Sequence, residues 1–179
     1  MTPSQRFWDR GLKSFGTAPP NEDIPCGTPG RHGGNMDTRH IGPGSRLYLP
    51  VFVSGANLAM GDLHAVMGDG EVSICGVEIA GEVTVKVDLI KGKQSKWPVL
   101  ETATDWYLIA SGQDLDEAAL FAMEEATAFL MRRTQLPLND VVSLLSIAGN
   151  LEISQVVDPL KTVRMRLPKK VYEPYQLAF

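Results

Sequence analysis

Two glycine-punctuated turns contain the residue types of a metal site or an acid/base site. The first, residues 33–37 (GGNMD), carries an amide and a carboxylate. The second, residues 61–71 (GDLHAVMGDGE), carries an imidazole and several carboxylates. Carboxylates and imidazoles bind divalent cations and transfer protons. The two turns together therefore indicate a functional site, although glycine and aspartate also make turns that have no other role.

Glu71 and His64 are the strongest candidates in the second turn. Residues 68–70 (GDG) predict a tight reversal that places Glu71 at the start of a buried strand, at the rim of an apolar wall. A buried carboxylate must be paired, metal-bound or of raised pKa; backbone N–H groups at the strand start are the alternative partners. If residues 58–65 are extended, His64 approaches Glu71 across a hairpin, either as a functional group or as a structural hydrogen-bonding residue.

Other polar residues give weaker signals. His32 and His40 flank the first turn, so that all three histidines of the chain lie near the two turns. Asp158 is expected to start a turn, and Glu152 is expected to face solvent. The sequence lacks the HExxH, GxSxG and phosphate-loop patterns, and hence the best-known signatures of metalloproteases, α/β-hydrolases and nucleotide-binding proteins.

The composition is that of one soluble globular domain. The 179 residues are 44% hydrophobic and 21% charged, and the net charge of −4 gives no reason to expect nucleic acid. The densest basic stretch, residues 161–170, alternates with apolar residues and predicts an edge strand. Cys26 and Cys75 form no disulfide framework, and the apolar run around Cys75 predicts a buried thiol. No signal-peptide core and no apolar stretch of ~20 residues occurs, so we expect a cytoplasmic protein without a membrane partner.

Period-two alternation predicts strands in the middle of the chain. Residues 46–53 and 82–90 alternate apolar and polar side chains, whereas residues 71–79 are apolar on both faces, as in a central strand. Shorter strands are expected at residues 97–100 and 105–110. The first 46 residues hold 8 of the 17 glycines and 6 of the 12 prolines, which predicts a long ordered loop region.

The pattern then changes to that of helices. Asp114 and Glu117 form a capping box ahead of an apolar stripe with helical spacing. Asn139 can cap a second helix, which stops at Gly149. A final strand at residues 162–167 closes the fold. These elements predict an α+β fold with a mainly antiparallel, sandwich-like β-sheet, a C-terminal helical pair and a closing strand.

The motifs at these positions resemble the acetamidase/formamidase family. The matching segments include residues 28–37 (TPGRHGGNMD), 47–51 (LYLPV), 61–71 and 153–158 (ISQVVD). The similarity runs from about residue 16 to residue 170, and the motifs are long and specific. We therefore expect residues 16–179 to form an acetamidase/formamidase-like domain, the C-terminal portion of the family fold, and residues 1–15 to be a divergent, poorly ordered leader.

The resemblance implies hydrolysis of short linear amides of the formamide or acetamide type to a carboxylate and ammonia. Asn35, Asp37, His64, Asp69 and Glu71 match polar motif positions of the family. A divalent metal, zinc first, held by Asp37, His64 and Glu71 could polarise the amide and activate water. In a metal-free version Glu71 is the general base, Asn35 and backbone N–H groups stabilise the oxyanion, and Asp69 completes the catalytic set.

The resemblance also implies a site built where two halves of the family fold meet, and this sequence lacks the N-terminal half. We therefore expect a homo-oligomer, or a partner that supplies the missing half, in addition to the small amide substrate. The alternative is a truncated, non-catalytic relative that keeps the fold and a pocket for a metal or a small molecule.

Overall fold

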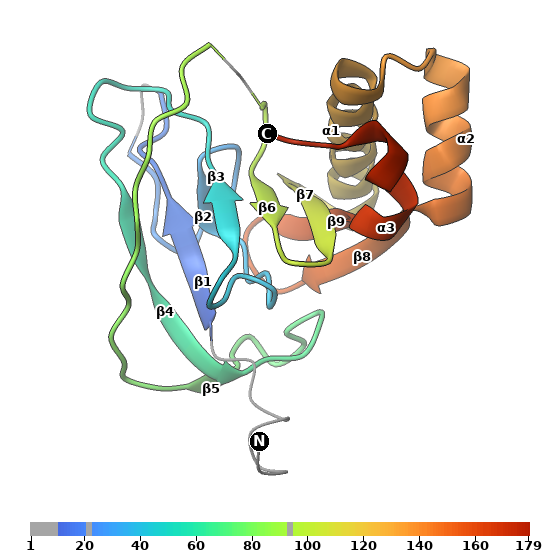
Figure 1. Ribbon diagram of the computed structural model, residues 1–179. Helices are drawn as coiled ribbons and strands as arrows, with labels where there is room; N and C mark the ends of the chain where they lie inside the picture. Colours follow the sequence, from blue (N-terminus) through green and yellow to red (C-terminus); the bar gives the residue numbers. More distant parts are fainter. Residues whose placement is uncertain (1–10, 21–22, 93–94) are drawn as a thin grey trace, which may run out of the picture.

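Two antiparallel sheets and a helical layer make up the fold (Figure 1). The computed structural model describes residues 11–20, 23–92 and 95–179. A four-stranded sheet has the order β2-β1-β4-β5, and a five-stranded sheet has the order β3-β6-β7-β9-β8. The strands are β1 (Gly11–Gly16), β2 (Gly33–Asn35), β3 (Arg46–Tyr48), β4 (Ala59–Val66), β5 (Val77–Glu78), β6 (Val99–Glu101), β7 (Asp105–Gly112), β8 (Asn150–Gln155) and β9 (Lys161–Pro168).

The helices pack on one face of the five-stranded sheet (Figure 1). They are α1 (Leu115–Thr134), α2 (Leu138–Ala148), the short α3 (Lys169–Tyr172) and the 3₁₀ turn η2 (Glu173–Tyr175). Trp106 and Leu108 of β7 and Met165 of β9 meet Ala122 and Phe129 of α1 in the main core. No helix in the described part of the chain combines the length and the apolar character needed to span a bilayer.

A second, smaller core fills the space between the two sheets. Its buried members are Met36, Ile41, Leu100, Tyr107 and Ile109, and partly buried side chains such as those of Phe15 and Leu63 pack against it. Met36 belongs to the first glycine turn, and Leu63 stands beside His64. This inter-sheet layer therefore anchors the segments from which the candidate site is built.

The predicted α+β class, with antiparallel sheets, a helical pair and a returning strand, is confirmed. Asp114 caps α1 by accepting a hydrogen bond from the backbone N–H of Glu117, as the capping box predicts. The second helix ends at Gly149 as expected. Its predicted cap is wrong, because Pro137 holds the N-cap position and Asn139 lies inside the helix. Proline fixes φ at the N-cap and has no side-chain acceptor, so α2 begins without a side-chain cap.

Two predicted strands are wrong. Residues 71–79 do not form a buried central strand, since only Val77–Glu78 pairs and the side chains of Val72 and Ile74 are 82% and 71% exposed. Cys75 is an exposed thiol rather than a buried one. Residues 80–92 have no strand pairing and are exposed throughout. Alternation of apolar and polar residues indicates which face of a strand would be buried, but a strand forms only where a neighbouring strand pairs with it.

Residues 161–170 also differ from the prediction, because β9 is not an edge strand. It pairs with β7 on one side and with β8 on the other. Its arginines are compatible with this position because carboxylates surround them: Arg164 is fully buried and bridges Asp69 and Glu152. The edge belongs to β8, which the sequence pattern did not predict.

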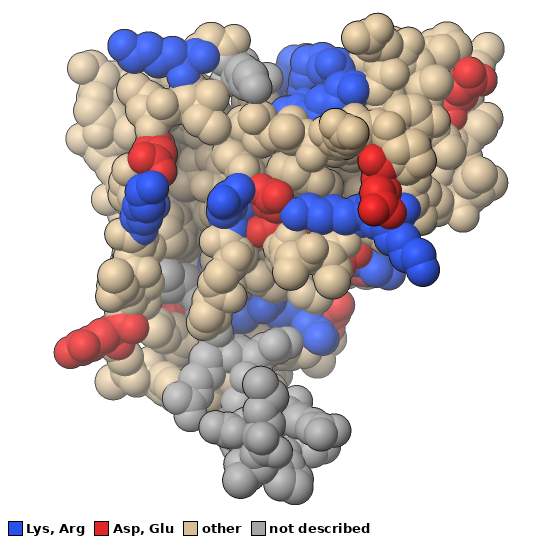
Figure 2. All heavy atoms as spheres, in the orientation of Figure 1, with Lys and Arg blue, Asp and Glu red and all other residues tan. Residues whose placement is uncertain are grey.

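Part of the expected leader belongs to the fold. Residues 11–15 lie in β1, which pairs with β2 and β4, so the expected boundary at residue 16 falls at the end of a strand. Residues 1–10 lie outside the described residues. The face drawn in Figure 2 carries acidic and basic side chains interleaved with uncharged surface, and no continuous basic area covers it.

Candidate metal centre between the two sheets

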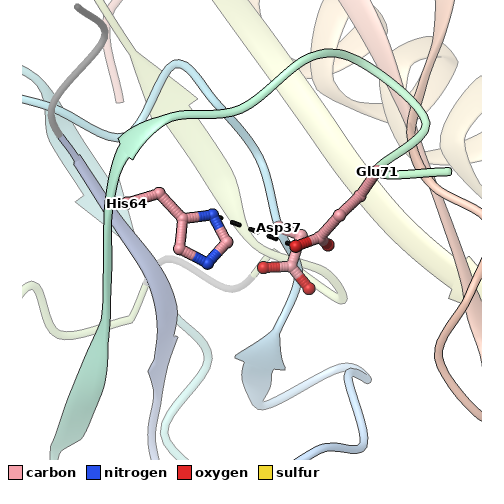
Figure 3. Close-up of side chains that lie close together, drawn as sticks. All are labelled: Asp37, His64 and Glu71. Carbon is pink, nitrogen blue, oxygen red and sulfur yellow. Dashed lines mark ion pairs between the residues drawn. The ribbon is translucent and has the colours of Figure 1, made fainter. Parts of the chain in front are cut away.

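The side chains of Asp37, His64 and Glu71 converge in the interior of the protein (Figure 3). One ligand atom from each lies within 4.8 Å of those of the other two. His64 Nδ1 is 3.9 Å from Glu71 Oε1. The three residues are 1%, 1% and 7% exposed, respectively. The structure thus brings together the three residues for which the sequence predicts metal binding.

Asp37 is placed by the paired glycines that precede it. Gly33 adopts a φ of +94°, and a Cβ at this position would collide with the backbone oxygen of Phe15 in β1. Glycine therefore lets β2 lie close against β1. The chain then turns at Asp37, which has a φ of 44° and donates its backbone N–H to the Lys13 carbonyl at 3.3 Å. The side chain of the intervening Met36 is fully buried in the inter-sheet core.

Ser154, at the end of β8, contacts the neighbours of both Glu71 and Asp37. The backbone N–H of Gly70 donates to the Ser154 carbonyl at 2.9 Å, so that the loop after β4 is fastened to the five-stranded sheet immediately before Glu71. The hydroxyl of the same serine lies 3.0 Å from the hydroxyl of Thr38, the residue after Asp37. Ser154 therefore connects both loops, and this connection explains how residues 34 positions apart meet.

Three polar atoms of the cluster lack hydrogen-bond partners. Within the described residues, both carboxylate oxygens of Asp37 and Nδ1 of His64 are buried without an N–H or hydroxyl donor, and the Asp37 carboxyl group is in contact only with other acids, those of Glu71 and Asp158. An unpaired buried polar group typically costs ~1–3 kcal/mol, and more when it is charged. A bound cation would satisfy these atoms. With Glu71 as the third residue, the site has one imidazole and two carboxylates, which leaves a coordination position open, as in catalytic zinc sites.

The cluster has perturbed acids. Burial, with repulsion from Glu71 and a contact with Asp158, raises the pKa of Asp37 from 3.8 to about 9. Burial also raises the pKa of Glu71, although Asp37 and His64 partly oppose that shift. The acids thus share one low-dielectric space in which they cannot all be ionised without a compensating positive charge.

Asp158 belongs to this environment and also lies in the predicted turn, between the end of β8 and the start of β9. Burial raises the pKa of its carboxyl group, and Asn35 Nδ2 donates to its Oδ2 at 3.0 Å. The side-chain oxygen of Asn35 accepts a hydrogen bond from Ser14. Asn35 therefore borders the site by holding Asp158. One feature of the sequence could have pointed to Asp158 as a site residue: it is the last residue of the segment 153–158, which resembles the family.

The remaining sequence candidates lie elsewhere. Asp69 forms ion pairs with Arg164 at 2.6 Å and with Arg39 at 4.0 Å, rather than with the cluster. His40 stacks on Tyr107 with the ring centroids 4.5 Å apart. His32 packs below the glycine turn, where burial lowers its pKa. None of these side chains is among the three that converge.

Solved acetamidase structures share this fold. The chain matches a predicted acetamidase/formamidase from Thermoanaerobacter tengcongensis with a TM-score of 0.93 and 48% identity, covering 96% of this chain and 57% of that one. An acetamidase from Bacillus halodurans gives a TM-score of 0.91 and 50% identity over 94% of this chain and 57% of that one. A formamidase from Methylophilus methylotrophus is 43% identical over 101 residues, which are 50% of this chain and 25% of that protein.

The model of the acetamidase/formamidase family matches residues 22–173. The chain therefore belongs to the acetamidase/formamidase family. It spans between half and three fifths of the length of the related solved structures, and a quarter of the formamidase.

Proposed function

We propose that this protein hydrolyses short linear amides to a carboxylate and ammonia at the cluster of Asp37, His64 and Glu71. We base this on the ligand atoms of Asp37 and His64, which are buried beside Glu71 without an N–H or hydroxyl donor. Membership of the family supports the reaction class, and the names of the relatives point to formamide and acetamide as substrates.

A divalent cation, zinc first, fits the donor set. Asp37, His64 Nδ1 and Glu71 would hold it, and a zinc ion bound by three protein ligands polarises a carbonyl group and lowers the pKa of water towards ~7. The three ligand atoms lie within 4.8 Å of one another, which supports this choice. The positive charge of the cation would also offset the repulsion between these buried carboxylates when they are ionised.

In the metal-free version of the site, Glu71 is the residue that we assign to proton transfer; with a cation bound, its carboxylate is a ligand instead. In the reaction, a water oxygen bonds to the amide carbon, the carbon–nitrogen bond breaks, and the nitrogen leaves as ammonia after gaining a proton. Glu71 takes the proton from the water and delivers one to the nitrogen, a task suited to an acid whose pKa burial has raised. Asn35 holds Asp158 beside it. Asp69, fastened to Arg164, steadies the loop two residues before Glu71 rather than acting on substrate.

A partner surface accompanies this proposal. Residues 80–92 are extended, exposed and without strand pairing, and Val87 and Leu89 each expose 68% of their surface. Figure 1 shows this segment, in light green, running along the outer side of the four-stranded sheet. A second copy of the chain, or a protein that supplies the rest of the family fold, would cover it. Sedimentation analysis and amide hydrogen exchange test this surface together. A clean monomer in which residues 80–92 exchange their amide hydrogens freely would contradict it.

An ammonia-release assay tests the reaction. Formamide, acetamide and propionamide are each incubated with the purified chain, and the metal content of the same preparation is measured. We expect turnover that a chelator removes and that Glu71→Gln abolishes, with an unchanged circular dichroism spectrum. Full turnover by Glu71→Gln would remove this residue from the mechanism. A metal-bound but inactive wild-type chain would favour the alternative, a non-catalytic relative that keeps the pocket.

A further inference from the structure

The imidazole ring of His64 has a second pair of carboxylates on the side away from Asp37. Its Nε2 lies 2.8 Å from Glu78 Oε1, at the end of β5, and 3.0 Å from Asp62 Oδ1, two residues earlier in β4. Ionised carboxylates only accept hydrogen bonds, so Nε2 must carry a hydrogen in both contacts. In the neutral ring Nδ1 is then bare, and Nδ1 is the atom that faces Glu71 without a partner.

We propose that Glu78 and Asp62 are positioning residues that fix His64 in the tautomer with hydrogen on Nε2 and orient its Nδ1 as a metal ligand. This inference rests on the proposed function for the identity of the ion, but the tautomer follows from the hydrogen bonds alone. Carboxylates that accept from the far nitrogen of a ligating imidazole hold the ring and raise its basicity.

Asp62 has a further polar contact, on the side away from His64. It adopts a left-handed φ of 60°, and its second oxygen lies 3.5 Å from Ser14 Oγ, whose one hydroxyl hydrogen is donated to the side-chain oxygen of Asn35. Asn35 in turn donates to Asp158. A continuous chain of polar contacts thus leads from Asp158 around the cluster to the far side of His64. Asn35 then has a structural reason to be an amide, because it must accept from one neighbour and donate to the other.

A competing arrangement uses the same residues. Asp62, Glu78 and His64 Nε2 also lie within 4.8 Å of one another and could bind an ion themselves. Two features favour the positioning role. The Nε2 side already has its hydrogen bonds, whereas the Nδ1 side consists of unpaired atoms. The Glu78 side chain is also 55% exposed, whereas Asp37 is 1% exposed, so desolvation strengthens binding only on the inner side.

Two measurements on the full chain test the proposal. Long-range proton–nitrogen NMR of the metal-free protein at neutral pH, with a His64→Gln sample to assign the signals, reports the tautomer without any need for metal or activity. We expect hydrogen on Nε2 in the wild type and a loss of this preference in a double variant with Asp62→Asn and Glu78→Ala. A bare Nε2 in the wild type would overturn the proposal even if the protein hydrolyses amides.

Zinc titration calorimetry gives the second readout. We expect Glu78→Ala to weaken zinc affinity by about 10- to 100-fold at unchanged stoichiometry. Glu78→Gln, which keeps an acceptor, should recover part of the loss, and Glu82→Ala, an exposed carboxylate in the neighbouring segment, should change nothing. Asp37→Asn should weaken binding more than Glu78→Ala. The reverse order, with Asp37→Asn neutral and Glu78→Ala without a binding isotherm, would place the ion on the Nε2 side and overturn the assignment.

Discussion

Gly76 lies directly against the imidazole ring of His64. A Cβ added at Gly76 would stand 2.5 Å from Nδ1 and 2.9 Å from Cγ of that ring. The loop before β5 therefore passes so close to His64 that only a glycine leaves the ring in place. The constraint is one of space, since His64 is 1% exposed and has little room to move away.

Gly76→Ala should displace the ring and disable the site. We expect a loss of zinc affinity and a destabilisation of about 1–3 kcal/mol, the usual cost of overpacking. Gly61→Ala is the matched control, because it lies in the adjoining strand β4 and its Cβ would meet nothing within 4 Å. Chemical denaturation and zinc titration of both variants make the comparison. Equal behaviour of the two would show that Gly76 does not constrain His64.

The pKa of Asp37 predicts how the metal-free protein responds to pH. Its folded-state pKa is raised to about 9 from 3.8, so the folded chain keeps a proton that the unfolded chain releases. The resulting stability is complete below pH 3.8 and is lost as the pH rises towards about 9. Urea denaturation of the chelated protein should therefore give a falling free energy of unfolding over this range. In Asp37→Asn the fall should be smaller, and an identical slope in the two proteins would contradict the assignment.

Metal binding should release the proton that Asp37 holds. Zinc titration at pH 7.5 in two buffers of different ionisation enthalpy counts the protons released. We expect about one more proton from the wild type than from Asp37→Asn, since a ligating carboxylate must be ionised. If the two proteins release the same number, Asp37 is not a ligand that deprotonates on binding.

Arg164 supports the site from the five-stranded sheet. It is fully buried, donates to Asp69 at 2.6 Å and to Glu152 at 3.0 Å, and also donates to the Ser154 hydroxyl at 3.1 Å. Arg164→Met should cost about 3 kcal/mol, the lower end of the range for breaking a buried pair, because both carboxylates reach solvent. Arg46→Met is the control: its side chain is 75% exposed and pairs with Glu101 at 3.7 Å, so we expect a change below ~1 kcal/mol. Similar losses in the two variants would contradict a supporting role for Arg164.

Local signals in the sequence predicted the helix ends. The capping box at Asp114 and Glu117 and the helix stop at Gly149 depend on neighbours within a few residues. The strand at residues 105–110 was predicted from its apolar run, and it forms because β6 and β9 pair with it. The segment at residues 82–90 failed for the opposite reason. Its alternation is as regular as that of any strand in the chain, but pairing depends on a neighbour, and no described strand pairs with it.

The residues of the site could be predicted from the sequence, but the way in which their side chains converge could not. Asp37, His64 and Glu71 stood out because glycine turns surround them. The convergence of their side chains depends on Ser154, which is 83 residues beyond Glu71 and fastens both loops through one hydrogen bond to Gly70 and one contact with Thr38. Spacing alone could not predict that Asp69 pairs with Arg164, a residue expected on an edge strand, or that Asp158 lies beside the cluster.

The position of a bound ion can be measured by anomalous diffraction at the zinc edge, from crystals of the zinc-loaded chain. We expect one strong peak bounded by a carboxylate oxygen of Asp37, Nδ1 of His64 and a carboxylate oxygen of Glu71, at about 2.0–2.2 Å from each. We also expect Glu78 and Asp62 to remain on Nε2 of the same ring. A peak on the Nε2 side, or no peak at His64 in crystals that contain zinc elsewhere, would contradict these expectations.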